Sequence, residues 1–298
     1  MTAAAPFATA TTIEEALAAL AAGARPVAGG TDLVVGARQG KAPLPDALVA
    51  IHRIAELCGI DWDRDALRLG ALVTHAEITA HPDVRTRFTA LADASAIVGS
   101  HATRAHGTIG GNLMNASPAM ETGGPLMCLG ATATLRSTAG TRAVAVEELL
   151  TAPGATVASG DELLVAMHVP RPAPGTGSAY VRLEYRRQME IAVVGATAVV
   201  TLSDGEVSRA RLAITALAPT IRRVPAAEEA LAGTAPDQAS VAAAALAAAV
   251  ASVPISDVRA SERYRRAMAE VIARRAIEIA LGRARGGDIS IPASAVGQ

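Results

Sequence analysis

The spacing of apolar and polar residues predicts short helices and strands along the first half of the chain. The segment from Thr11 to Gly23 has a Thr-Thr cap, an acidic first turn and apolar residues at helical spacing, which is typical of a capped amphipathic helix. Thr74-His75-Ala76-Glu77 has the spacing of a capping box and predicts another helix start. The expected strands are Arg25–Ala28, Leu48–Ile51, Ile60–Trp62, Leu67–Leu69, Ala131–Arg136, Arg142–Val146 and Glu162–Val169, and further helical segments are Leu33–Arg38, Ala90–Val98 and Pro118–Leu129.

A segment rich in proline and glycine, Pro170–Gly177, predicts a domain boundary. Beyond it, apolar-rich runs around a hairpin signal predict three antiparallel strands, and alanine-rich segments predict helices. The strands are Ala179–Tyr185, Ala192–Leu202 and Val207–Ala216, and the helices are Ala226–Leu231, Pro236–Ala251 and Ser261–Leu281. In the last helix, arginines alternate with glutamates, which favours a solvated face with intrahelical ion pairs over a basic docking surface.

Composition and charge exclude several classes of protein. Hydrophobic residues make up 51% of the 298 residues and aromatic residues only 2%, so the core must consist of Ala, Val, Leu and Ile. Lys41 is the only lysine, which leaves almost no candidate for a phosphate-loop or Schiff-base lysine. The formal net charge of -1 lacks the basic surplus of a nucleic-acid-binding protein.

The two cysteines, Cys58 and Cys128, cannot supply the four thiolates of an iron–sulfur cluster or a zinc finger. Both stand in apolar surroundings, so we expect buried thiols. The segment Met1–Ala10 lacks the charged leader of a secretory signal, and the apolar stretch Val241–Val253 is too short to span a bilayer. These features predict a soluble, cytoplasmic protein without a membrane span.

Two glycine pairs are the strongest candidates for a ligand site. The loops Ala28–Asp32 and Thr108–Asn112 each begin where a strand is expected to end. Glycine allows positive φ and close backbone approach, so consecutive amides can surround a phosphate without a lysine. Either loop alone is equally well an ordinary tight turn, but two together, flanked by Thr, Asn and Asp, favour a pyrophosphate ligand. A valine at Gly110 is expected to fill the ligand's space and leave the fold largely intact.

His101 and His106 bracket Arg104 and form the only clustered histidines. A metal site is one interpretation, but loop histidines near an anionic ligand are the favoured one, because no His-x-x-x-His or Cys-x-x-Cys pair is present. The sequence also lacks the three spaced glycines of a dinucleotide fold and the Gly-x-Ser-x-Gly elbow of hydrolases.

Beyond the glycines themselves, the residues of the two loops carry a family signature. The motifs are Pro-Val-Ala-Gly-Gly-Thr-Asp-Leu at 26–33 and Gly-Thr-Ile-Gly-Gly-Asn-Leu at 107–113, followed by Asn-Ala-Ser-Pro at 115–118. Together they resemble the FAD-binding medium subunits of the xanthine dehydrogenase and carbon monoxide dehydrogenase family. The resemblance continues in the family's order through residues 99–104, 186–192 and 264–266, so it covers essentially the whole chain.

This resemblance implies an α+β fold. It consists of a two-part FAD-binding domain of the vanillyl-alcohol-oxidase (PCMH) type and a small C-terminal domain with a three-stranded antiparallel sheet and helices. With the boundary above, the domains are expected at residues 1–174 and 175–285, followed by a tail at 286–298.

The resemblance also implies the residues that contact FAD. Glu121 stands where the family commonly has an aspartate that meets a cofactor hydroxyl. Arg182 stands at a usually basic position, before the loop Leu183–Val193 near the flavin ring. The implied cofactor-binding residues are Ala28, Gly29, Gly30, Thr31, Asp32, Val98, Gly99, Thr108, Ile109, Gly110, Gly111, Asn112, Glu121, Leu164 and Arg182. No catalytic residue and no metal ligand is assigned.

The function implied by the resemblance is electron relay within a molybdenum hydroxylase. A molybdopterin-containing large subunit would oxidise the substrate, a 2Fe–2S small subunit would carry the electrons, and FAD on this chain would pass them to NAD, oxygen or a quinone. The cysteine count agrees with a cluster on another chain, and the cofactor would supply the redox chemistry. The alternatives are a free-standing FAD oxidoreductase with its own substrate and an assembly scaffold that has lost flavin.

Overall fold

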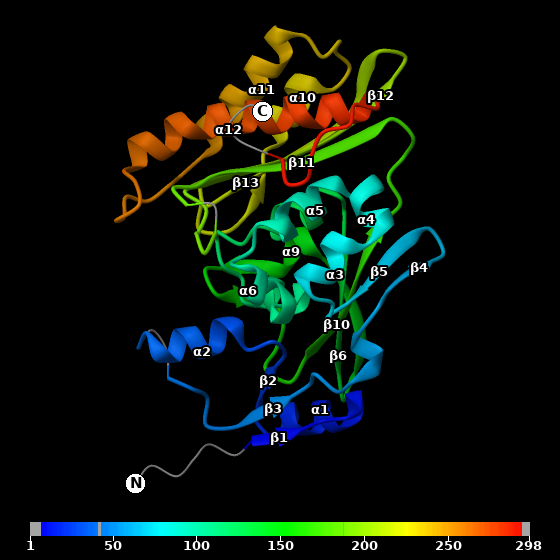
Figure 1. Ribbon diagram of the computed structural model, residues 1–298, viewed down its shortest axis with the longest axis vertical. Coiled ribbons are helices and arrows are strands. Elements are labelled where there is room, and N and C mark those ends of the chain that lie inside the picture. Colours follow the sequence, from blue (N-terminus) through cyan, green and yellow to red (C-terminus); the bar gives the residue numbers. More distant parts are fainter. Residues whose placement is uncertain (1–6, 41–42, 187, 294–298) are drawn as a thin grey trace.

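The computed structural model describes residues 7–40, 43–186 and 188–293. Residues 1–6, Lys41, Arg187 and the last residues of the expected tail lie outside them. The chain has a mixed α+β architecture. In Figure 1 its N-terminal elements lie at the bottom, a group of short helices lies in the middle, and a sheet covered by longer helices forms the top.

A small parallel sheet and one helix begin the fold. The sheet has the order β1-β3-β2, and its strands are Phe7–Thr9 (β1), Arg25–Val27 (β2) and Leu48–Ala50 (β3). Helix α1 (Ile13–Ala21) forms because Ile13, Leu17 and Leu20 recur at helical spacing and are all buried. Thr12 caps this helix by accepting a hydrogen bond from the amide of Glu15, as the sequence predicts.

An antiparallel sheet of order β4-β5-β10-β6-β7 follows, and it confirms both predicted strand pairs. Its strands are Ile60–Asp63 (β4), Ala66–Gly70 (β5), Thr132–Ser137 (β6), Gly140–Ala145 (β7) and Leu163–Pro170 (β10). Strand β10 lies between β5 and β6. Strands Leu150–Ala152 (β8) and Ala155–Thr156 (β9) form a separate two-stranded sheet, and they lie between β7 and β10 in the sequence.

Short helices separate this sheet from the C-terminal part (Figure 1). They are His75–Ala80 (α3), Pro82–Arg87 (α4), Thr89–Ala96 (α5), His101–His106 (α6), Ile109–Met114 (α7), Gly123–Cys128 (α8) and Val146–Leu149 (α9), with a 3-10 turn at Ala55–Leu57 (η1). The capping box predicted at Thr74 is confirmed, with Glu77 as its second member.

The helix predicted over Pro118–Leu129 is wrong in its first half, because α8 begins only at Gly123. The backbone before it makes other hydrogen bonds. The carbonyl of Pro118 accepts from the amide of Ala216 at 2.8 Å, and the Ser117 hydroxyl accepts from the amide of Ala119 at 3.3 Å. A local side-chain bond and a distant backbone partner thus replace the helical bonds of this segment.

The C-terminal sheet has the order β11-β12-β13-β14 in the described residues, so the expected three-stranded sheet has a fourth strand. The strands are Thr176–Leu183 (β11), Val194–Ser203 (β12), Glu206–Thr215 (β13) and Arg222–Arg223 (β14). Strand β14 is two residues long and cannot show an alternating pattern. Its pairing with Ala213 and Ile214 defines it instead.

Three helices cover this sheet: Pro225–Leu231 (α10), Gln238–Ala251 (α11) and Glu262–Ala284 (α12). Helix α12 crosses the sheet at close range (Figure 1). A Cβ atom at Gly177 would lie 2.1 Å from the carbonyl oxygen of Ala280, so a glycine is required at this crossing. The shared core consists of Ala, Val, Leu and Ile side chains, as the low aromatic content predicts.

A buried ion pair joins the C-terminal part to the short helices. Asp93 of α5 accepts two hydrogen bonds from Arg283 of α12, at 2.6 and 3.0 Å. The amides of Tyr180 and Ala293 donate to the same carboxylate. Burial raises the pKa of Asp93, against the opposing effect of Arg283. These bonds hold α12 and the segment near Ala293 on α5.

Candidate functional site

The first glycine loop ends strand β2 and begins helix α2 (Thr31–Arg38). Gly30 adopts a left-handed conformation with a φ of 68° and is the N-cap of α2, where no side chain of the described residues supplies a cap. The first-turn amides of α2 therefore face a position that favours an anion. Asp32 lies in this turn, and partial burial of its carboxyl group raises its pKa.

The two glycine loops are close together because the first one crosses the chain just before the second. A Cβ atom at Gly29 would lie 1.9 Å from the carbonyl oxygen of His106. Gly107 in turn lies next to the Thr31 hydroxyl, since a Cβ atom there would be 3.4 Å from Thr31 Oγ1. Gly29 is thus required for the contact between the loops.

The second loop differs from the first because its amides already have partners. The amides of Ile109 and Gly110 donate to the carbonyls of Val73 and Ala71, at 2.9 and 3.0 Å. Thr108 caps α7 by accepting from the amide of Gly111, and its carbonyl accepts from Asn112. The expectation of free amides is therefore wrong for residues 109–112 of the second loop, whereas the start of α2 has no side-chain cap in the described residues.

Gly110 corrects a second expectation. A Cβ atom at this position would lie 2.5 Å from the carbonyl oxygen of Ala71, inside the protein. A valine there would displace the loop from the end of strand β5 rather than fill an external ligand space. Gly111, by contrast, is exposed, and its Cβ atom would meet only Thr108 Oγ1, at 3.0 Å.

Val98 and Gly99 form a turn beside these loops. Gly99 has a φ of 52°, and the Val98 carbonyl accepts from Arg104 Nη1 at 3.0 Å. The carbonyl of Gly99 accepts from the amide of Met189, so the loop after β11 reaches this turn. Leu164 is buried on β10, next to Val165, whose carbonyl accepts from the amide of Ala71. Through Ala71, backbone hydrogen bonds thus connect Gly110 of the second loop to Val165 on β10, the neighbour of Leu164.

Glu121 and Arg182 form a buried ion pair beside the second loop. Arg182 Nη1 donates to Glu121 Oε1 at 2.5 Å, and Arg182 Nε donates to Glu184. Burial raises the pKa of Glu121 to about 7, although Arg182 lowers it. The neighbouring Thr122 hydroxyl donates to Asn112 Oδ1 at 2.6 Å, which connects the pair to the second loop.

Arg182 retains a free donor in this pair. Its Nη2 atom is buried and has no hydrogen-bond partner among the described residues. A buried guanidinium nitrogen without a protein acceptor fits a ligand that supplies one. Together with the uncapped α2 terminus, this donor makes the residues suitable for a large cofactor that carries both phosphate and carbonyl groups.

Two residues beside the candidate site, Glu184 and His75, were not predicted from the sequence. Glu184 stands two residues after Arg182, a spacing that places both on one side of a strand and could have indicated their pairing. His75 is buried at the start of α3, its amide donates to the Gly107 carbonyl, and its Nδ1 atom has no partner in the described residues. Burial and the Arg104 charge lower the pKa of His75 to about 4. No sequence signal distinguishes this histidine.

His101 and His106 are exposed on α6, whereas Arg104 between them is buried. The described residues contain no group of three or more His, Cys, Asp or Glu side chains that could hold a metal ion. Cys128 is buried as predicted, but Cys58, directly after the turn η1, is exposed. No helix among the described residues is long and apolar enough to cross a membrane.

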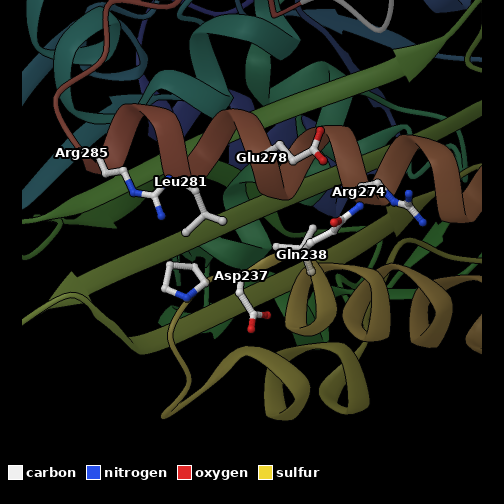
Figure 2. Close-up of a pocket in the computed structure, with 8 residues that line it drawn as sticks. Asp237, Gln238, Arg274, Glu278, Leu281 and Arg285 are labelled. Carbon is white, nitrogen blue, oxygen red and sulfur yellow. The ribbon is translucent and has the colours of Figure 1, made fainter.

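A hollow of about 310 Å³ lies elsewhere, between the start of α11 and the second half of α12. Figure 2 shows its charged lining, with Asp237, Arg274, Glu278 and Arg285 around Leu281. None of the predicted cofactor residues lines it. Asp237 in this lining caps α11 by accepting a hydrogen bond from the amide of Ser240. The hollow is therefore separate from the proposed cofactor site.

Comparison with known proteins defines the class. Residues 3–172 match the family model described as the FAD binding domain in molybdopterin dehydrogenase, and residues 179–280 match the CO dehydrogenase flavoprotein C-terminal domain. The chain belongs to this family of FAD-binding subunits of molybdenum hydroxylases. Its cofactor is FAD, and it is an oxidoreductase subunit.

Individual relatives are similar over nearly their full length. The carbon monoxide dehydrogenase medium chain of Afipia carboxidovorans is 32% identical over 88% of this chain and 90% of its own. The 6-hydroxypseudooxynicotine dehydrogenase complex subunit alpha of Paenarthrobacter nicotinovorans is 33% identical over 94% and 95%. A solved carbon monoxide dehydrogenase structure from Hydrogenophaga pseudoflava aligns with a TM-score of 0.90 at 32% identity, covering 93% of this chain and 97% of that one.

Proposed function

We propose that this chain is the electron-relay subunit of a multi-subunit molybdenum hydroxylase and holds FAD on its two glycine loops. The observation that carries the proposal is the start of α2 at Gly30, which has no side-chain cap in the described residues. The close contact of Gly29 with the His106 carbonyl places this helix start next to the second loop. The relatives named above are a medium chain and a complex subunit of dehydrogenases, which supports a role within a larger enzyme.

The two loops have different tasks in this proposal. The amides at the start of α2 bind the diphosphate, because they lack a side-chain cap and lie at the positive end of a helix dipole. The second loop shapes the site, since its own amides from 109 to 112 already bind protein acceptors. We propose contacts to FAD from Ala28, Gly29, Gly30, Thr31, Asp32, Val98, Gly99, Thr108, Ile109, Gly110, Gly111, Asn112, Glu121, Leu164 and Arg182.

When bound, FAD supplies the chemistry of accepting an electron pair and releasing it to an acceptor. The protein residues orient the cofactor and adjust its surroundings. Arg182 directs its free Nη2 donor toward a carbonyl or hydroxyl acceptor of the ligand. Burial raises the pKa of Glu121 to about 7, so this carboxyl group titrates near neutral pH beside Arg182.

We further propose the finer organisation of the chain. The FAD-binding domain of the PCMH type covers residues 1–174, the C-terminal domain covers 175–285, and 286–298 form a tail. The separate parallel and antiparallel sheets of the first part support two subdomains. The alanine-rich core under α12 supports a separate C-terminal domain.

The proposed partners are a molybdopterin-containing large subunit and a 2Fe–2S small subunit in the cytoplasm. Two cysteines, one exposed and one buried, leave this chain without the ligands of a cluster, so the electrons reach FAD from another chain. The final acceptor is NAD, oxygen or a quinone.

The test combines spectroscopy with reconstitution. The purified chain is expected to show the visible absorbance bands of oxidised flavin. Flavin reduction by substrate is expected only after the 2Fe–2S and molybdenum subunits are added. A colourless chain that cannot be reconstituted with FAD would refute the cofactor site. Direct reduction by a substrate without partners would instead favour a free-standing oxidoreductase.

A further inference from the structure

The guanidinium of Arg182 is held by two carboxylates from different parts of the chain. Arg182 is close to the end of β11, which lies between α12 and α5 (Figure 1), and only 1% of its side chain is exposed. Glu121, from the segment before α8, accepts from its Nη1 atom, and Glu184, directly after β11, accepts from its Nε atom. The Glu190 carbonyl also accepts from Nη1, at 3.3 Å. The Nη2 atom has no partner among the described residues.

Glu184 determines the direction of this free Nη2 donor. A guanidinium group is planar and rigid, so acceptors on two of its nitrogens fix the direction of the third. Glu121 and the Glu190 carbonyl both accept from the same nitrogen, Nη1. Without Glu184, the group is therefore free to pivot about Nη1, and the Nη2 donor loses its fixed direction.

The local sequence brings Glu184 to this position. Side chains two residues apart in extended backbone lie on the same side, so Glu184 follows Arg182 on one side of the chain. Leu183, between them, packs against the alanine-rich core of the C-terminal part. Glu184 keeps 24% of its side chain exposed, compared with 9% for Glu121. A shorter side chain at Glu184 would therefore remove the bond to Arg182 with little loss of packing.

The negative charge of Glu184 is unfavourable for an anionic cofactor. Burial raises the pKa of Glu121, Arg182 opposes this shift, and the Glu184 charge adds to it, so the two carboxyl groups lie close together. A second carboxylate beside Glu121 would repel the diphosphate of FAD. A favourable effect of Glu184 on FAD binding would therefore come through its bond to Arg182 Nε rather than through its charge.

We propose that Glu184 is a positioning residue of the cofactor site, which orients Arg182 so that Nη2 donates to an oxygen acceptor of FAD. The inference rests on the proposed function, because it requires FAD next to Arg182. The acceptor is a carbonyl or hydroxyl oxygen, since the diphosphate is assigned to the start of α2. Glu184 acts on the cofactor only through Arg182.

The test is a titration of the FAD-free chain with FAD. Glu184→Ala should weaken the Kd by at least about tenfold, because Nη2 loses its fixed direction. Glu184→Gln should recover most of this affinity, since its amide oxygen still accepts from Nε. If charge alone acted, both variants would bind the anionic cofactor more tightly than the wild type. Glu270→Gln removes the same charge from an ion pair with Arg274 on α12 and should bind like the wild type.

A second pair of variants tests whether Glu184 acts through Arg182. Arg182→Lys keeps a positive charge beside Glu121 but lacks the planar group with its separate Nη2 donor. In this background, Glu184→Ala should change the FAD affinity by no more than about twofold, because the two substitutions affect the same contact. Circular dichroism of each FAD-free variant checks that the chain is folded.

Three results would overturn the assignment of Glu184. They are wild-type or tighter FAD binding by Glu184→Ala, equal losses in Glu184→Ala and Glu184→Gln, and the same loss from Glu184→Ala whether position 182 is arginine or lysine. The comparison of alanine with glutamine decides the question even if the lysine variant does not fold. A wild-type chain that binds no FAD would instead contradict the proposed function, so the two failures are distinguishable.

Discussion

At the scale of single residues, adjacent glycines of the second loop have different neighbours. Gly110 is packed against the Ala71 backbone, whereas Gly111 faces outward next to Thr108. Gly110→Ala should lower the free energy of unfolding of the FAD-free chain by about 1–3 kcal/mol, because an added methyl group would overpack this contact. Urea denaturation measures the effect.

Gly111→Ala is the control for that experiment. Its Cβ atom has only the Thr108 hydroxyl nearby and an ordinary φ, so the unfolding free energy should change much less. Equal destabilisation by the two alanines would show that the second loop is not held against β5 in the way the Ala71 contact requires.

Glu121 should make stability depend on pH near neutrality. Its folded pKa of about 7 exceeds the ordinary 4.5, so folding favours the protonated carboxyl group. This contribution is complete below the unfolded pKa and is lost as the pH rises through 7. The unfolding free energy of the wild type should therefore fall by roughly 2–3 kcal/mol more than that of Glu121→Gln between pH 5 and pH 8.

Denaturant titrations at several pH values check this expectation. Glutamine keeps the shape of the protonated acid but does not titrate, so its curve should be flatter over the same interval. Parallel pH profiles for the two proteins would mean that Glu121 is ionised in the folded state throughout the range.

The sequence indicated Glu121 and Arg182 as site residues only through the family resemblance. Their pairing could not be predicted, because it joins positions 61 residues apart across the contact between the two parts of the chain. The two glycine loops were recognised from local signals alone. Which of them keeps free amides depends on the ends of other elements, such as the Ala71 and Val73 carbonyls.

At the scale of elements, helix α2 stands apart from the others. It has eight residues, buries none of them and lacks a side-chain cap in the described residues. An isolated helix of this length is marginally stable in water. Its order should therefore depend on what binds at its first turn.

Hydrogen exchange tests this dependence. Amides of residues 34–38 should exchange at least about tenfold more slowly when FAD is bound, because phosphate at the N-terminus stabilises the helix. Amides of α1, which is capped by Thr12 and packed on the first sheet, should change little and provide the control. Unchanged exchange in α2 with FAD bound would contradict a phosphate site at its N-terminus.

Elements with strong local signals were predicted well. The Thr12 cap, the Thr74 capping box and the β12–β13 hairpin all arise from neighbouring residues. The predictions were wrong where contacts between residues distant in the sequence determine the structure. The Pro118 carbonyl accepts a hydrogen bond from the amide of Ala216 instead of a helical one, and β14 is defined by its pairing with β13.

At the scale of the whole molecule, a buried ion pair and a shared loop connect the FAD-binding part to the C-terminal part. Asp93 and Arg283 join α5 to α12, and the loop after β11 reaches Gly99 beside the cofactor loops. The C-terminal part thereby supplies Arg182 to the proposed site.

The most direct measurement of the central claim is the FAD affinity of two variants at the start of α2. Thr31→Glu and Thr31→Gln have nearly the same size and differ by one negative charge. If the first-turn amides bind the diphosphate, Thr31→Glu should bind FAD at least about tenfold more weakly than Thr31→Gln in a titration of the FAD-free chain. Equal affinities of the two variants, or a wild-type chain that binds no FAD, would contradict the account.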